Sequence, residues 1–289
     1  MHASGTDNRT MRNDARRAHG LIGLLITMAI IAVLFALLMS SMNRAVTGEG
    51  SAVEGTVRSI EDQAQLMAIH QAFAIHALGD PRNRGGRFLV PSVVSRTDDR
   101  SLDTTADLYS AMIALNFLRP ETLISPNEYS TWVEADTDYD FRAYQPAEGR
   151  FWDTDFKADL QDVSNVSYAH MPLYGRRFEK HWSGESRNLV LGNRGPKDGI
   201  DDPASYTYGR NKQWAGHIVF GDGSIDFITT FTPGNVQVMP PGAGGGGEGG
   251  ESASTADNIF RFDDGVDGVD AILGFTKKMT ANGPELVWD

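Results

Sequence analysis

The chain has 289 residues, which is enough for one or two domains. Its 26 Lys and Arg against 38 Asp and Glu give a formal net charge of −12, and this acidic balance excludes nucleic acid as an expected partner, because phosphate neutralisation supplies most of that affinity. The absence of cysteine excludes a disulfide scaffold, a thiolate metal site and a cysteine nucleophile.

A long apolar run lies near the N-terminus, from Leu21 to Met39, with Thr27 as its only polar residue. At about 1.5 Å per residue, such a run spans roughly the 30 Å hydrocarbon core of a bilayer as a helix. Four arginines precede it: Arg9, Arg12, Arg16 and Arg17. The positive-inside rule therefore predicts a single-pass protein with residues 1–18 in the cytoplasm and the rest across the membrane. A cleaved signal peptide would need a shorter apolar region, whereas a plain anchor is an alternative.

The same residues resemble the N-terminus of type IV prepilins and type II secretion pseudopilins, the prepilin N-terminal cleavage and methylation family. That family's usual pattern is Gly-Phe-Thr-Leu-Ile-Glu-Leu-Leu, followed by a stretch rich in Val, Ile and Ala. When Ala29–Leu34 is matched to that stretch, Leu21-Ile22 and Leu24-Leu25 fall in register. The resemblance implies that a prepilin peptidase cuts between Ala18 and His19. It also implies an inner-membrane protein with a periplasmic head, whose partners are the lipid bilayer and other pseudopilins.

Two residues depart from the family pattern. Ala18 stands where the family has Gly before the cut, and Gly23 stands where it has Glu at the fifth mature position. A carboxylate inside hydrocarbon is costly and needs a partner, which in the family is implied to be the amino-terminus of a neighbouring subunit. Gly23 has no such charge, so the resemblance suggests a minor, tip-located or divergent subunit.

A second helix-compatible segment follows, from Thr56 to Leu78, and Gly79-Asp80-Pro81 ends it. We therefore expect residues 19–79 to form a transmembrane and stalk helix. Its apolar residues recur at helical spacing and form a broad apolar face: Val57, Ile60, Ala64, Met67 and Ala74, widened by Leu66, Ile69, Phe73 and Ala77. His70 and His76 are six residues apart, which does not place them together as metal ligands.

Residues 80–239 are expected to form the periplasmic head. A helix is predicted over Leu102–Leu118, with Asp103 or Thr104 as its N-cap. Short β-type runs are Arg87–Val94, Arg187–Leu191, His217–Phe220 and Ile225–Phe231, and Gly221-Asp222-Gly223 predicts a hairpin turn between the last two. The fold class is therefore α+β: a long N-terminal helix followed by a loop-rich, mostly antiparallel, pilin-like β head.

The hairpin also resembles a C-terminal signature of prepilin-like proteins that are abundant in planctomycete-type bacteria, a His followed nine residues later by Asp-Gly. Its last part matches at Ile218-Val219-Phe220-Gly221-Asp222-Gly223. The signature His falls on Lys212, so this position departs from the pattern.

Residues 240–254 are rich in glycine and predict a flexible linker. Residues 255–289 then form an acidic C-terminal extension of the head. Ile259–Phe262 and Ala271–Thr276 are its candidate strands, and we expect them to pack on the head as an edge hairpin.

Two groups of aspartates resemble possible metal sites. Asp263, Asp264, Asp267 and Asp270 offer oxygens to Ca²⁺, but Asp-Gly pairs are ordinary turn formers, so a solvated turn is preferred. Asp136, Asp138 and Asp140 imitate the start of an EF-hand, but Phe141 and Ala147 replace its required Gly and Glu. We expect no metal and no cofactor.

The serine, histidine and aromatic residues give no clear catalytic or sugar-binding pattern. Ser183 lacks a nucleophile-elbow context, and His170, His181 and His217 are scattered, so no catalytic residue is expected. Six aromatic residues would suit either a core or a glycan platform: Tyr168, Tyr174, Trp182, Tyr206, Tyr208 and Trp214.

The sequence therefore predicts a non-enzymatic structural subunit or assembly factor of a type II secretion or type IV pilus-like system. The alternative is a membrane-anchored periplasmic module that binds a ligand such as a glycan and does not polymerise.

Overall fold

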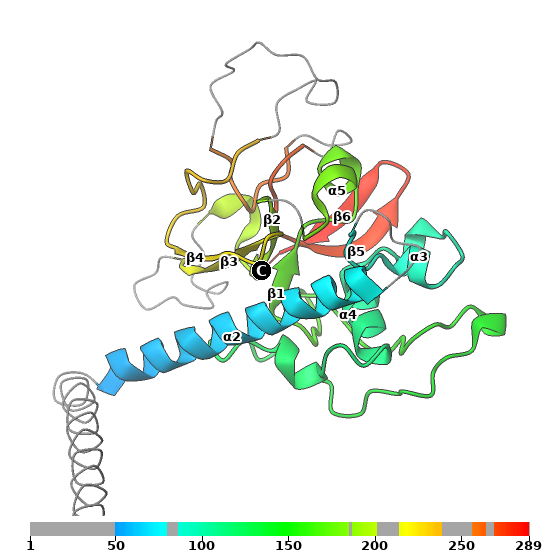
Figure 1. Cartoon of the computed structure of the whole chain (residues 1–289). Coiled ribbons are helices and arrows are strands. Elements are labelled where there is room, and N and C mark those ends of the chain that lie inside the picture. Colours follow the sequence, from blue (N-terminus) through cyan, green and yellow to red (C-terminus); the bar gives the residue numbers. More distant parts are fainter. Residues whose placement is uncertain are drawn as a thin grey trace, which may run out of the picture. The chain divides into compact units, whose positions relative to one another are not determined.

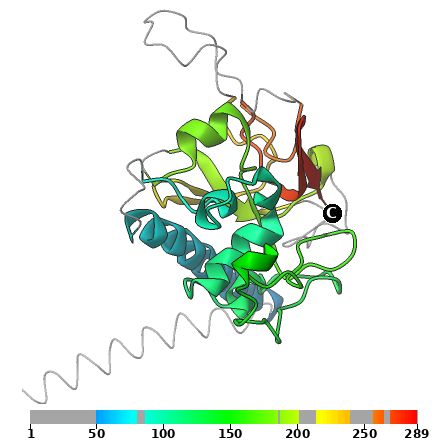
Figure 2. The same ribbon diagram turned by 90° about the vertical axis from the view of Figure 1, so that its right-hand side faces the viewer.

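Helix α2 (Gly50–Gly79) lies across a four-stranded antiparallel sheet, and helix α4 (Thr105–Ala114) packs beside it (Figure 1, Figure 2). The structure is a computed structural model that describes residues 50–79, 86–184, 187–200, 214–238, 256–263 and 269–288. In this part of the chain, helices and antiparallel strands occur together, and the fold class is α+β.

The larger sheet has the strand order β1 (Tyr168–His170), β2 (Leu189–Asn193), β3 (Gly216–Phe220) and β4 (Ile225–Ile228). All neighbouring strands are antiparallel, with Tyr168 opposite Asn193 and His217 opposite Phe227. The hairpin that the sequence predicts around Gly221-Asp222-Gly223 is confirmed as β3 and β4. The strand expected over Arg187–Leu191 is β2, displaced by two residues.

A second hairpin consists of β5 (Phe275–Thr280) and β6 (Gly283–Val287). It is joined to the edge of the first sheet, because the backbones of His170 and Gly274 exchange two hydrogen bonds of 3.3 and 3.1 Å. The expected C-terminal hairpin is therefore present but shifted along the chain. Ile259–Phe262 is not a strand, and the expected strand over Ala271–Thr276 overlaps β5 only in its last two residues.

The expected helix Leu102–Leu118 is present as α4 but is shorter at both ends, and it begins at the second of the two N-caps that the sequence offers. Thr104 is the N-cap, and its hydroxyl oxygen accepts a hydrogen bond of 3.1 Å from the backbone N–H of Asp107. Capping by a Thr side chain satisfies one of the amide groups that the first helical turn leaves without a partner.

The strand expected over Arg87–Val94 is wrong. Helix α3 (Pro91–Val94) occupies its second half, with Pro at the first helical turn, where its missing N–H is not needed. The other short helices are α5 (Gly175–His181) and the 3₁₀ turns η1 (Arg100–Leu102), η2 (Pro120–Leu123), η3 (Pro146–Glu148) and η4 (Lys197–Gly199).

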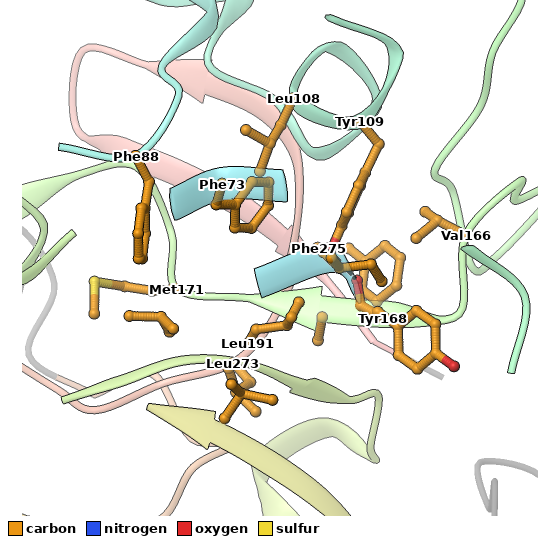
Figure 3. Packing of buried hydrophobic residues seen from close by; sticks show 14 of the residues in the cluster. Phe73, Phe88, Leu108, Tyr109, Val166, Tyr168, Met171, Leu191, Leu273 and Phe275 are labelled. Atoms are coloured by element: carbon orange, nitrogen blue, oxygen red, sulfur yellow. Dashed lines mark hydrogen bonds between the residues drawn. The ribbon is translucent and has the colours of Figure 1, made fainter. Parts of the chain in front are cut away.

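The hydrophobic core lies between α2, α4 and the sheets (Figure 3). Phe73 of α2 is fully buried in it, and its ring centroid is 5.8 Å from that of Phe88, 6.3 Å from Tyr109 and 5.5 Å from Trp182. The core also contains residues of the C-terminal segment, such as Leu273 and Phe275, so that segment belongs to the head.

The chain divides into two compact units, Met1–Val57 and Arg58–Asp289, and the first lies almost wholly outside the described residues. Within the described ranges, no helix combines the length and apolar character needed to cross a membrane. The apolar run Leu21–Met39, the cleavage residues Ala18 and His19, Gly23 and the linker 240–254 lie outside those ranges.

The two sides of α2 give a matched pair of stability variants. Phe73→Ala should lower the free energy of unfolding by about 3–5 kcal/mol, because it opens a cavity among three aromatic rings. Ile75→Ala, two residues along on the exposed side, should change it by less than about 0.5 kcal/mol. Denaturant unfolding of the full chain in detergent measures both. Equal losses would show that α2 does not pack with the orientation described.

Candidate functional site

The inner face of α2 carries a carboxylate, Asp62, whose side chain is fully buried. One of its oxygens, Oδ2, lies 2.9 Å from Nδ1 of His217. The other, Oδ1, accepts hydrogen bonds from Ser125 Oγ (2.5 Å), Asn193 Nδ2 (3.0 Å) and the Tyr168 hydroxyl (3.0 Å). A buried carboxylate is tolerated only when it is hydrogen-bonded and paired in this way.

These partners come from three neighbouring strands and one loop. Tyr168 is on β1, Asn193 is opposite it on β2, and His217 is on β3, where its backbone N–H donates to Asn193 Oδ1 at 2.6 Å. Asp62 therefore fixes both the position of α2 along the sheet and its rotation about the helix axis.

A buried ion pair lies next to this network. The guanidinium of Arg194 binds both carboxylate oxygens of Glu128, at 3.0 and 2.5 Å, and the side chains are 2% and 5% exposed. Ser167 Oγ donates to the same carboxylate at 2.8 Å. Arg194 directly follows Asn193, and Ser167 directly precedes Tyr168; both Asn193 and Tyr168 are partners of Asp62. The Arg194–Glu128 ion pair therefore holds the loop of Glu128 against the same strands.

The β3–β4 turn also contacts α2. Nε2 of His70 donates to the carbonyl of Gly221 at 2.7 Å. Gly223 has φ +83°, and a Cβ there would lie 3.2 Å from the His70 ring, so this turn requires glycine. Hydrogen bonds from Ser224 hold the pKa of the Asp222 carboxyl below its usual range. The Asp222-Gly223 turn is therefore part of the surface on which α2 packs.

Ser125, Asp62 and His217 are the residue types of a nucleophilic triad, but their arrangement is different. In a triad the serine donates to the histidine, whereas Ser125 donates to Asp62. Asp62 and His217 are also almost inaccessible, at 0% and 5% side-chain exposure, so a substrate cannot reach them. The geometry is that of a structural connection between the helix and the sheet.

The outer face of α2 is mostly apolar, with Gln71 as its polar residue, and it is exposed except at the half-buried Met67. Its residues recur every three or four positions: Ile60, Ala64, Met67, Gln71, Ile75 and Leu78. We call them the outer stripe. Ile60 is 62% exposed, Ile75 59% and Leu78 86%. The sequence grouped Ile60 and Ala64 with Leu66 and Phe73 in one broad face, but the structure divides them between opposite faces of the helix.

The residues that the sequence singles out as possible ligands do not form a site. Asp270 is buried and accepts a hydrogen bond of 2.9 Å from the backbone of Asp263, which is a turn contact, while Asp264 and Asp267 lie outside the described residues. Asp136, Asp138 and Asp140 line a depression of about 320 Å³ with other acids. Within the described ranges, no group of three or more His, Asp or Glu is arranged to hold a metal ion.

The proposed aromatic platform is not formed by the residues that the structure describes. Tyr168, Trp182 and Trp214 are at most 1% exposed and belong to the core. Tyr174 is half-buried, and Tyr206 and Tyr208 lie outside the described residues.

Asp62 is the central residue that the sequence analysis missed. It lies four and seven residues before Leu66 and Ile69, and this spacing places it on the buried face. A carboxylate at such a position needs a partner, which was the available signal.

The comparisons with known proteins add no relative: no family model, no curated protein and no solved structure matches the chain.

Asp62→Ala should lower the free energy of unfolding by about 3–5 kcal/mol, because it removes the buried acceptor shared by Ser125, Asn193 and Tyr168. Glu61→Ala is the matched control, since Glu61 is exposed on the same helix and its loss should change stability by less than about 0.5 kcal/mol. Denaturant unfolding measures both variants. A loss below about 1 kcal/mol for Asp62→Ala would contradict the anchoring role.

His170 should make stability depend on pH. It is buried between Met171 O, to which Nδ1 donates at 2.7 Å, and Thr105 Oγ1, which donates to Nε2 at 2.8 Å. Burial lowers the pKa of His170 to about 4. Between about pH 6.5 and 4 the unfolded chain therefore binds a proton that the folded chain does not, and stability falls as the pH falls.

The expected loss from this residue across that window is about 3 kcal/mol. Unfolding free energies of the unmodified chain and of His170→Gln, measured from pH 7 to 4, give its share as the difference between the two curves. Parallel curves would contradict the assignment.

Proposed function

We propose that this chain is a prepilin-like, non-enzymatic structural subunit or assembly factor, of a minor type, in a type II secretion or type IV pilus-like system. In this proposal residues 19–79 form a transmembrane and stalk helix, and the periplasmic head consists of residues 80–239 with the C-terminal extension 255–289. The leader 1–18 is cytoplasmic and is removed by prepilin peptidase between Ala18 and His19.

The observation that carries the proposal is the outer stripe of α2. A helix that only supported a head would expose polar residues on its free side, but Ile60, Ile75 and Leu78 are all more than half exposed. Burying one such side chain is worth about 1.5–3 kcal/mol. A helix that is apolar on both faces is typical of one that packs on its own domain and also on a partner.

The buried network supports the same role. The contacts of Asp62 with the sheet prevent the helix from rotating to hide the outer stripe. Rotation would separate Asp62 from its hydrogen-bond partners and leave buried polar groups unpaired, and this costs several kcal/mol. The stripe is therefore held in the orientation that a neighbouring subunit's helix requires.

The membrane part of the proposal rests on the sequence. The run Leu21–Met39 has the length of a bilayer span, and the arginines before it favour a cytoplasmic N-terminus. A glycan-binding module without polymerisation is the other candidate. The burial of Tyr168, Trp182 and Trp214 gives it no support.

Two measurements on cells with an active prepilin peptidase test the proposal. Mass spectrometry of the purified chain should find a mature N-terminus at His19. Ile75→Lys should reduce recovery of the chain in sheared, high-molecular-weight assemblies by about 10-fold or more, because a charge would be buried between helices.

The matched control is Val93→Lys, since Val93 is 55% exposed against 59% for Ile75 but belongs to α3 and not to the outer stripe. Its recovery should equal that of the unmodified chain. An intact Met1 would contradict processing, and equal recovery of the Ile75 and Val93 variants would contradict the assembly role of the stripe.

A further inference from the structure

A cavity of about 560 Å³ opens on the head where three segments far apart in the sequence meet. Its walls are η1, the residues from Tyr174 to Glu179 at the start of α5, and the turn of the β5–β6 hairpin at Met279–Ala281. This volume lies within the range of about 300–1,000 Å³ that is usual for small-molecule sites. None of these residues belongs to the outer stripe or to the Asp62 network, so the inference is independent of the proposed function.

One wall of the cavity is held rigidly. The ring of Phe178 is 3% exposed, and the guanidinium groups of Arg87 and Arg100 lie 5.4 and 5.6 Å from its centroid. Arg100 also donates to the carbonyl of Leu173 at 2.6 Å and pairs with the buried Asp103 at 2.8 Å. The charge of Arg100 is therefore already compensated.

The opposite wall depends on the hairpin. Gly283 has φ +114°, and a Cβ at this position would lie 3.2 Å from the Tyr174 ring, so the ring packs directly on the hairpin backbone. Tyr174 is half-buried and lines the cavity. Thr280 Oγ1 donates to the carbonyl of Gly283 at 2.7 Å and closes the turn. Both walls are thus formed before any ligand binds.

Two opposite charges, Arg176 and Glu179, line the cavity. Arg176 is half-buried and Glu179 is exposed, and both line the cavity. They lie three residues apart on α5, a spacing at which Arg and Glu often pair. Neither side chain forms a hydrogen bond or ion pair with any residue that the structure describes. The guanidinium of Arg176 therefore has donors available for an acceptor in the cavity.

We infer that this cavity binds a small ligand that carries both a carboxylate and an ammonium group, the chemistry of a free amino acid or a short peptide. The carboxylate binds Arg176, whose fork of N–H donors matches two carboxylate oxygens. The ammonium group binds Glu179. The apolar part of the ligand lies against Tyr174 and the hairpin turn. A simple anion is disfavoured because Glu179 repels it, and a neutral sugar would leave both charges unpaired.

Calorimetric titration of the full chain in detergent micelles tests the site with alanyl-leucine and leucine, each in its free form, its N-acetyl form and its amide form. Alanyl-leucine or leucine should bind saturably with a dissociation constant below about 1 mM. Tighter binding of leucine indicates a free amino acid, and tighter binding of the dipeptide indicates a peptide. Capping either end of the tighter ligand should weaken binding about 10-fold or more.

Substitutions of Arg176 and Glu179 test which residue binds the carboxylate of the ligand and which binds its ammonium group. Arg176→Gln should weaken the uncapped ligand about 10-fold and abolish the difference between acid and amide, and Glu179→Gln should abolish the difference between free and acetylated amine. Arg119→Gln and Glu121→Gln, exposed and outside the cavity, are the matched controls and should change nothing. Thermal melting verifies that each variant is folded.

Three results would overturn the inference: no saturable binding of either probe with a dissociation constant below about 1 mM, affinity unchanged in Arg176→Gln, or equal binding of capped and uncapped forms.

Discussion

The buried carboxylate of Asp62 is the constraint on which the arrangement of this molecule depends. A charge with no solvent access must keep its hydrogen-bond partners, and those of Asp62 come from β1, β2, β3 and the loop of Ser125. Hydrophobic contacts alone would allow α2 to slide or rotate, because apolar packing has little direction. The hydrogen bonds of Asp62 allow one position and one rotation of α2 on the sheet, because they join the helix to three adjacent strands.

One consequence is that α2 has two different apolar faces. Leu66, Ile69 and Phe73 fill the core of the head, whereas Ile60, Ile75 and Leu78 face outward. The inner face stabilises the head, and the outer one is available to a partner. In the proposed function this partner is the helix of a neighbouring subunit. The cavity beside α5 is a separate feature of the head, formed partly by the C-terminal hairpin.

Local signals in the sequence predicted several elements well. The N-cap at Thr104 and the turn at Gly221-Asp222-Gly223 were found because their causes lie within a few residues. The run before Pro91 was wrongly expected to continue as a strand, because its apolar residues suit a buried strand and a buried helix equally well. Here Pro91 at the helix start decided the outcome.

The sites were harder to predict, because their parts are distant in the sequence. The partners of Asp62 lie between 63 and 155 residues away, and the cavity joins segments near positions 100, 176 and 280. The spacing of apolar residues predicted a helix over Thr56–Leu78. Because apolar residues lie on both sides of this helix, the spacing did not show which side packs on the head. Asp62 carries that information, since a carboxylate among core positions marks the inner face.

The most direct test of this account is a cysteine scan of α2, which is simple because the chain has no native cysteine. Single cysteines at Ile60, Gln71 and Ile75 sample the outer stripe, Ala72 and Ala77 the inner face, and Gln63 an exposed position outside the stripe. In detergent, maleimide should label the stripe and Gln63 quickly and the inner face slowly. In assembled membranes, only the stripe should become protected, by about 10-fold or more. Fast labelling of the inner face in detergent, or an outer stripe that is no better protected in membranes than position 63, would contradict the account.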